Sequence, residues 1–216
     1  MVQEGRRERK KRHTREVIVG AAFTLFAERG FEAVTVTEIA DKADVARATL
    51  FSYFPTKESI VLGVVGDDDP ARIVATRAQG TTPLDALRSH YRAFARAGGA
   101  DTVGDPAVAD DGPRRPDLLT CVRVIIQSPT LTLGLTRLLD SQRTALALVL
   151  ATESGAGDCD IRPDLAAAQI CAVISALQSK FFGRLAAGES YEQAAARLPG
   201  DVELAFDLLQ HGIGSP

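Results

Sequence analysis

The stretch TVTEIADKADVARATLFSYF, residues 35–54, contains two short segments of helical periodicity separated by a tight turn. Thr35 and Glu38 have the spacing of a capping box, in which the threonine hydroxyl accepts from the third amide and the carboxylate reaches back to the first. Asp44 is a residue type that tolerates the left-handed backbone of a turn. The spacing predicts a helix-turn-helix unit, and the alternative that it leaves open is a plain helical hairpin in an all-α core.

Signals on both sides of this stretch predict further helices, and no strand-like alternation occurs, so the predicted fold class is all-α. Apolar residues recur at three- and four-residue spacing after Thr14, the expected N-cap, and stop at Gly30, which can adopt a left-handed C′ conformation. Pro55 ends the second helix of the unit, and Thr56 caps the next. The predicted helices span 14–29, 36–43 and 47–53, then begin at 57, 70 and 83, and continue with 117–127, 129–153, 163–187 and 190–211, the last with a break near Pro199.

The composition is that of an ordinary soluble globular protein. The chain has 216 residues, of which 45% are hydrophobic and 25% are charged, and this excludes disorder over the whole length. No apolar run approaches the roughly 18 residues that span a bilayer, and the charged N-terminus lacks the apolar region of a secretory signal. Cys121, Cys159 and Cys171 are widely spaced, as is typical of reduced thiols. These features predict a cytoplasmic protein without a membrane partner.

Positive charge is concentrated at the N-terminus of a chain whose net charge is −3. Its first 15 residues hold seven arginine and lysine side chains and two glutamates. Such an asymmetry is expected when one end of a protein meets a polyanion, whereas a disordered, solubilising tail is the alternative that the run alone leaves open. We expect residues 1–13 to form a basic flexible arm.

Residues 14–62 resemble the DNA-binding domain of the TetR family of bacterial transcriptional regulators. The resemblance rests on an aromatic-Ala-x-x-Gly-Phe stretch, a Thr-Val-x-x-Ile-Ala helix and a Leu-aromatic-x-x-Phe-Pro-x-Lys-Glu ending. The chain departs from the family pattern in four places. The family more often has glycine at the first and third of these places, a serine or threonine cap at the second, and tyrosine at the fourth. These departures are Asp44, Ala46, Ala48 and Phe51.

The resemblance implies a helix-turn-helix domain over residues 14–58, with its motif at about 35–54. The outer face of the helix 47–53 is expected to approach DNA bases, where Arg47 can bind a guanine or a phosphate. The starts of the helices at 36 and 57 are favourable positions for phosphate. The predicted DNA-binding residues are Thr35, Thr37, Arg47, Ala48, Thr49, Phe51, Ser52, Tyr53 and Lys57.

The resemblance also implies an effector-binding and dimerisation domain over residues 59–216, in which the last two helices form a four-helix bundle with a second copy. The helix 163–187 is apolar on more than one side, which agrees with burial on two sides, and a wider monomeric core is the alternative. Residues 98–116, rich in Gly, Pro, Asp and Ala, are predicted to form a long loop. The predicted effector-pocket residues are His90, Tyr91, Phe94, Arg123, Gln127, Gln142, Gln178 and Phe182.

Other classes of function have weaker support in the sequence. No nucleophile, base and metal set converges as an enzyme requires. The acidic run GDDDPAR, residues 66–72, suggests a carboxylate metal site, but a cap followed by proline at a helix start explains it more simply. A thiol-sensing regulator that uses Cys121 or Cys171 stays open. The sequence therefore predicts a non-enzymatic homodimer without cofactor or metal that binds a palindromic DNA operator and is released by an unknown small-molecule effector.

Overall fold

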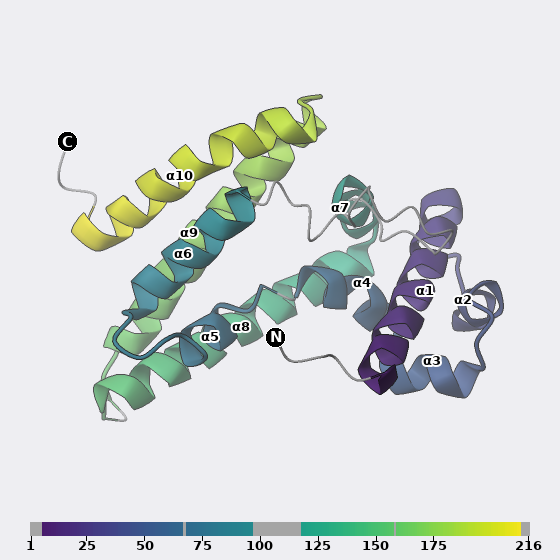
Figure 1. Cartoon of the computed structure of the whole chain (residues 1–216), viewed down its shortest axis with the longest axis horizontal. Coiled ribbons are helices and arrows are strands. Elements are labelled where there is room, and N and C mark those ends of the chain that lie inside the picture. The colour runs from purple at the N-terminus through teal and green to yellow at the C-terminus, as the bar shows by residue number, and fades with distance from the viewer. Residues whose placement is uncertain (1–5, 67, 97–117, 158, 213–216) are drawn as a thin grey trace. The chain divides into compact units, whose positions relative to one another are not determined.

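The structure is a computed structural model that describes residues 6–66, 68–96, 118–157 and 159–212. These residues form ten helices and no strand, in agreement with the predicted all-α class (Figure 1). The predicted loop 98–116 lies outside the described residues. The helices are α1 (Arg6–Arg29), α2 (Val36–Lys42), α3 (Arg47–Tyr53), α4 (Lys57–Val65), α5 (Pro70–Ala75), α6 (Pro83–Arg96), α7 (Leu118–Gln127), α8 (Pro129–Ser154), α9 (Arg162–Ala186) and α10 (Tyr191–His211).

The chain divides into two compact units. The first comprises residues 1–66 and 100–135, and the second comprises residues 67–99 and 136–216. The helix α8 therefore belongs to the first unit at its beginning and to the second over the rest of its length.

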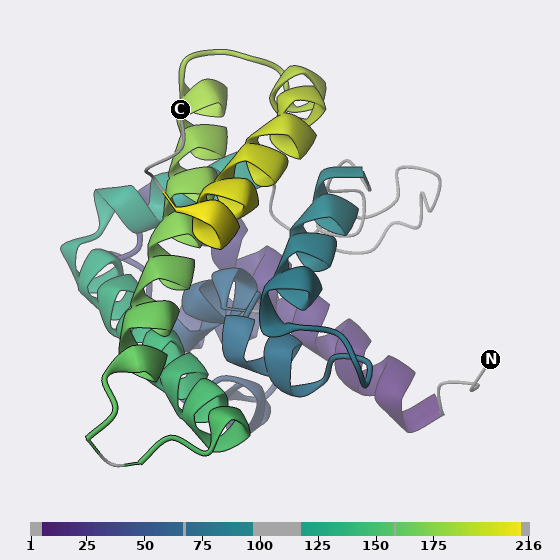
Figure 2. The same ribbon diagram turned by 90° about the vertical axis from the view of Figure 1, so that its left-hand side faces the viewer.

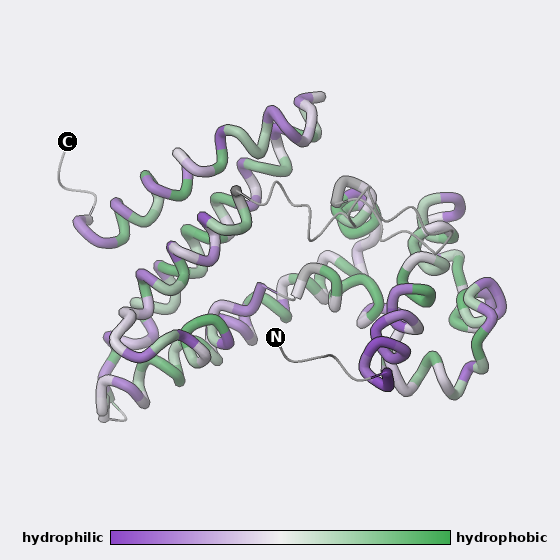
Figure 3. Tube along the Cα trace, in the orientation of Figure 1, coloured by the Kyte–Doolittle hydropathy of each residue, from purple (hydrophilic) through white to green (hydrophobic). Residues whose placement is uncertain are grey.

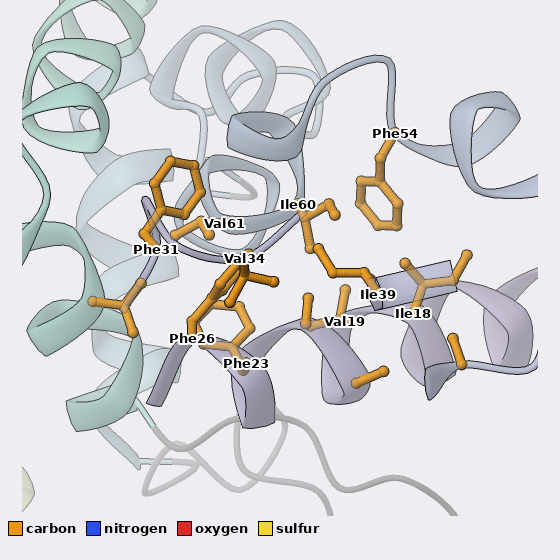
Figure 4. Close-up of a cluster of buried hydrophobic side chains, with 14 of the residues drawn as sticks. Ile18, Val19, Phe23, Phe26, Phe31, Val34, Ile39, Phe54, Ile60 and Val61 are labelled. Carbon is orange, nitrogen blue, oxygen red and sulfur yellow. The ribbon is translucent and has the colours of Figure 1, made fainter. Parts of the chain in front are cut away.

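A single hydrophobic cluster holds the first unit together (Figure 4). Ile18 and Phe26 of α1, Ile39 of α2, Leu50 of α3 and Ile60 of α4 are each at most 2% exposed. Because the four helices share this cluster, the short helices α2 and α3 are fixed on the longer α1 and α4.

The first unit extends beyond the predicted 14–58 domain, since α7 and the first turns of α8 pack on the same cluster. Cys121 and Val124 of α7 and Leu131 of α8 are buried in it. Ser128 caps α8 by accepting from the Leu131 amide at 3.2 Å, and its hydroxyl donates to Glu32 Oε1 at 2.6 Å. This hydrogen bond lowers the pKa of Glu32. The sequence does not assign α7 and the start of α8 to this core, because the residues that they contact lie far earlier in the chain, as Glu32 does for Ser128.

Most predicted helix starts are confirmed. Thr35 and Thr56 each form a complete capping box, and Asp69 caps α5 directly before Pro70. Gly30 has a φ of 79° after α1, as expected of a left-handed C′ residue.

The start of α1 and the course of α10 differ from the predictions. The first helix begins at Arg6, and the Thr14 hydroxyl donates to the Lys10 carbonyl at 3.0 Å within it, so Thr14 is not an N-cap. Arginine and lysine have good helix propensity, and the basic run therefore continues the helix instead of forming a flexible arm over residues 6–13. Figure 3 shows α1 as hydrophilic in its first half and hydrophobic in its second. The helix α10 continues through Pro199 without the predicted break.

The second unit is organised around α6, α9 and α10, which lie side by side (Figures 1 and 2). Leu87 of α6 and Phe206 of α10 are fully buried, and the Phe206 ring lies 6.3 Å from the ring of Tyr91 of α6. Beside them, Arg88 and Arg92 of α6 both donate to the Glu203 carboxylate of α10, and these hydrogen bonds lower the pKa of Glu203 to about 2. The α6–α10 contact therefore combines a hydrophobic interior with a charged border.

The packing of α8 on the first unit gives a matched test. Leu131 is fully buried and Leu133 is 53% exposed on the same helix. We expect Leu131→Ala to lower the free energy of unfolding of the first unit by about 2–5 kcal/mol, and Leu133→Ala to change it by less than about 0.5 kcal/mol. Urea unfolding followed by circular dichroism measures both. Equal effects of the two substitutions would show that α8 does not contribute to this core.

Candidate nucleic-acid interface

The helices α2 and α3 form a helix-turn-helix unit. The turn uses Asp44 with a φ of 51°, and the Val45 amide donates to the Ala40 carbonyl at 3.0 Å. Asp44 is the described non-glycine residue with positive φ, as predicted from its residue type. The tight turn brings the start of α3 against the end of α2, and the buried Leu50 then directs the opposite side of α3 to the surface.

Thr35 holds α2 in place through its capping box. Its backbone amide donates to Glu38 Oε2 at 2.8 Å, and its hydroxyl accepts from the Glu38 amide at 3.3 Å. Arg29 of α1 donates to the other oxygen of Glu38 at 2.6 Å and to the Ala33 carbonyl at 3.0 Å. The hydrogen bonds from Thr35, and after them the one from Arg29, lower the pKa of Glu38 to about 2. Arg29 was missed by the sequence analysis because its partner is on another helix.

Lys57, which the sequence predicts as a phosphate contact, makes hydrogen bonds within the protein. Its Nζ donates to the carbonyls of Phe31 and Val34 at 2.7 and 3.0 Å and lies 4.1 Å from the centre of the Phe31 ring. The ammonium group thus satisfies carbonyls in the loop between α1 and α2. Its position at the start of α4 is confirmed, but the side chain is directed into the protein and stabilises the loop that precedes α2.

The exposed residues of α3 form what we call the reading face: Arg47, Ala48, Phe51 and Ser52. Thr49 is half-buried beside it. Tyr53 was predicted on the outer face, but it is also half-buried and packs against the hydrophobic cluster, because the same side of the helix carries Leu50 and Phe54. Thr37 of α2 is exposed, as expected.

The predicted effector residues are divided between the two units. Arg123 and Gln127 are exposed on α7 in the first unit, whereas the other six belong to the second. Phe94 and Phe182 pack on the Phe181 ring, with centroid distances of 6.5 and 5.7 Å. The sequence could not separate these groups, because α7 and α8 follow one another directly along the chain.

The other residues of the predicted effector set are at least partly covered. His90 Nε2 lies 3.0 Å from Asp68 Oδ1. Tyr91 is 6% exposed, and its hydroxyl has no hydrogen-bond partner among the described residues. Burial raises the pKa of Tyr91, and the charges of Asp68 and Asp69 act in the same direction. Gln142 and Gln178 are half-buried on α8 and α9.

The described residues contain no cluster of three or more histidine, cysteine or acidic side chains that could hold a metal ion. Among these residues, α9 is long and apolar enough to cross a membrane by length and composition alone. The helix meets this criterion by its average composition, although glutamine and serine residues interrupt its apolar sequence.

A two-helix unit with a partly exposed second helix, held on a hydrophobic cluster shared with α1 and α4, is the arrangement of a helix-turn-helix DNA-binding protein. The comparisons with known proteins agree. A family model described as "Bacterial regulatory proteins, tetR family" matches residues 18–64. The HTH-type transcriptional regulator TcmR of Streptomyces glaucescens is 30% identical over 209 residues, which cover 94% of this chain and 84% of TcmR.

Two further matches are a relative that aligns over part of the chain and a solved structure of similar fold. The HTH-type transcriptional repressor KstR of Mycobacterium tuberculosis is 34% identical over 87 residues, covering 39% of this chain and 37% of KstR. The solved SmeT–triclosan complex has a TM-score of 0.55 at 18% identity, over 92% of this chain and 90% of that one. The chain belongs to the TetR family of bacterial regulatory proteins. It is a DNA-binding transcriptional regulator and not an enzyme.

The charge on Glu38 gives a pH-dependent test of the cap that holds α2. The folded pKa of about 2 lies below the ordinary value of 4.5, so ionised Glu38 stabilises the folded state above about pH 4.5, and this stabilisation is lost as the pH falls toward 2. Glu38→Gln keeps the shape of the capping box but removes the charge that faces Arg29. We expect the Tm of the unchanged protein to exceed that of the variant at about pH 6, and the difference to shrink below about pH 4.5. Thermal melts across this range measure it, and a constant difference would contradict the assignment.

Proposed function

We propose that the chain acts as a homodimer on a palindromic DNA operator, in the cytoplasm, and represses transcription until a small molecule binds. The observation that carries the proposal is the reading face of α3, which is exposed while the rest of the helix is fixed in the core. A helix presented in this way fits the major groove.

The basic half of α1 supports binding to the DNA backbone. Residues 6–13 are exposed and helical, and they carry six arginine and lysine side chains against one glutamate. An exposed cationic segment next to a reading helix can neutralise phosphates without distinguishing bases. In this proposal α1 contributes affinity and α3 contributes sequence preference.

Exposed leucines on the last two helices support dimerisation. Leu204 and Leu208 of α10 are 62% and 43% exposed at a spacing of four residues, which places them on one side of the helix. Leu165 of α9 is 51% exposed, and α9 also carries exposed alanines at positions 172 and 176. A second copy that covers these residues would explain why α9 is apolar on more than one side. A two-fold dimer presents two reading helices roughly 34–36 Å apart, which requires a palindromic site.

Release by a small molecule is supported by the second unit and by a structural neighbour. The buried Tyr91 hydroxyl, without a partner among the described residues, is a polar group that a bound molecule can satisfy. The neighbour SmeT was solved in complex with triclosan. A ligand that weakens operator binding must itself be bound more weakly, by the same factor, when operator is present.

A thiol switch has less support than ligand release. Cys121 is fully buried in the first unit, and burial raises the pKa of the half-buried Cys171. Both environments disfavour the reactive thiolate.

The dimer and the operator are tested together. Selection of DNA from a random pool by the full chain is expected to enrich a palindrome, whose affinity is then measured by titration. The double variant Leu204→Arg/Leu208→Arg places charges on the proposed dimer face, and we expect a monomer in sedimentation whose operator affinity is lower by roughly tenfold or more. Leu148→Arg is the matched control, since Leu148 of α8 is 68% exposed outside the last two helices. A double variant that stays dimeric, or a monomer that keeps full operator affinity, would contradict the proposal.

Salt dependence separates backbone contacts from positioning residues. We expect deletion of residues 1–12 to make the slope of log affinity against log salt shallower by about 0.9 for each phosphate that this segment neutralises. Lys57→Met removes the donors to Phe31 and Val34 while keeping the aliphatic stem, so it should lower the Tm and leave the slope unchanged. An unchanged slope after the deletion would assign the basic segment to solubility alone.

A further inference from the structure

The reading face of α3 is chemically unusual for a DNA-contacting surface, because most of it is apolar. At 3.6 residues per turn, its residues follow one another around the helix axis in the order Arg47, Phe51, Ala48 and Ser52. Phe51 and Ala48 therefore lie next to each other in the middle of the face, and Arg47 is the charged residue at one border.

Phe51 lies outside the hydrophobic cluster of the first unit. The inner side of α3 is filled by Leu50 and Phe54, which are 0% and 2% exposed, whereas Phe51 is 42% exposed. Among the large hydrophobic side chains that the structure describes as exposed, Phe51 is the aromatic one. An aromatic ring that is left in water loses the favourable free energy of burial, which a partner surface can restore.

The polar groups near the centre of this face are few. The Ser52 hydroxyl donates to the Thr49 carbonyl at 2.6 Å, so its one hydrogen is already used within the helix. Ala48 has no polar side-chain atom, and neither does Ala46, the N-cap residue, which makes no side-chain hydrogen bond. The centre of the face therefore offers apolar carbon and no hydrogen-bond donor to the edges of the bases.

In the major groove, the C5-methyl group of thymine is the apolar feature that distinguishes one base pair from another, and alanine and phenylalanine side chains contact it. We infer that Phe51 and Ala48 read a thymine methyl group in each half-site, with Arg47 supplying the polar contact beside it. The inference rests on the proposed operator binding and names what this surface recognises there. Sequence preference then depends on the presence of a methyl group as well as on hydrogen bonds.

The experiment replaces thymine by uracil, one position at a time, in the operator obtained by random selection. Deoxyuridine keeps every hydrogen-bonding group of thymidine and lacks only the methyl group. We expect one or two thymines in each half-site at which dU weakens binding by about three- to fivefold, the effect of one buried methyl-sized group. Titration at fixed salt concentration measures the ratio of the dT and dU affinities.

Three variants assign the effect to its side chain. Phe51→Ala should bind the dT and dU operators equally at the sensitive position, and Phe51→Tyr should restore the preference for dT because the ring is kept. The matched control is Ile126→Ala, because Ile126 of α7 is 73% exposed in the same unit and lies outside the helix-turn-helix. Its preference for dT should equal that of the unchanged protein. The Tm of Phe51→Ala should stay near that of the unchanged protein, since the ring is outside the core.

The outcomes separate this inference from the proposed function. A selection that enriches a palindrome, in which uracil is tolerated at every position, overturns methyl reading and leaves the proposed operator binding in place. A full dT preference in Phe51→Ala also overturns the assignment to this residue. A selection that enriches no sequence overturns both.

Discussion

The recognition helix depends on the burial of its inner side. With seven residues α3 is well below the length of about 12–15 residues at which isolated helices become stable, and its N-cap residue Ala46 makes no side-chain hydrogen bond. Leu50 and Phe54, packed in the cluster shared with α1 and α4, therefore supply the free energy that keeps this segment helical. The orientation of the reading face follows from this burial.

Several polar side chains of the first unit make hydrogen bonds that position the helix-turn-helix. Thr35 is engaged with Glu38, and Lys57 with two loop carbonyls. Together with the Arg29–Glu38 ion pair, these contacts surround α2 and the loop that precedes it. For the proposed operator complex this gives a division of roles, in which α2 and its surroundings set the geometry and the sparsely polar α3 is the helix proposed to meet the bases.

In the second unit, α10 has apolar residues on two sides: one side is buried in the unit and the other is exposed. Phe206 is buried toward α6, and Arg88 and Arg92 bind Glu203 at the border of that contact. Leu204 follows Glu203 along the chain and is exposed, because successive residues of a helix point about 100° apart. The burial of Phe206 sets the side of α10 that faces α6, and the ion pairs of Glu203 lie at the border of that contact.

The sequence by itself determined the features whose causes lie within a few residues: the capping boxes at Thr35 and Thr56, the left-handed turn at Asp44, the all-α class and the helix-turn-helix. Tertiary structure decided the inward direction of Lys57, the partial burial of Tyr53 and the membership of α7 and the start of α8 in the first unit. A cap or a turn is set by hydrogen bonds between residues that are close in sequence, so it can be recognised from the sequence alone. The direction of a long side chain and the extent of a core depend on partners many positions away, such as Glu32 for Ser128, and only the folded chain brings those partners together.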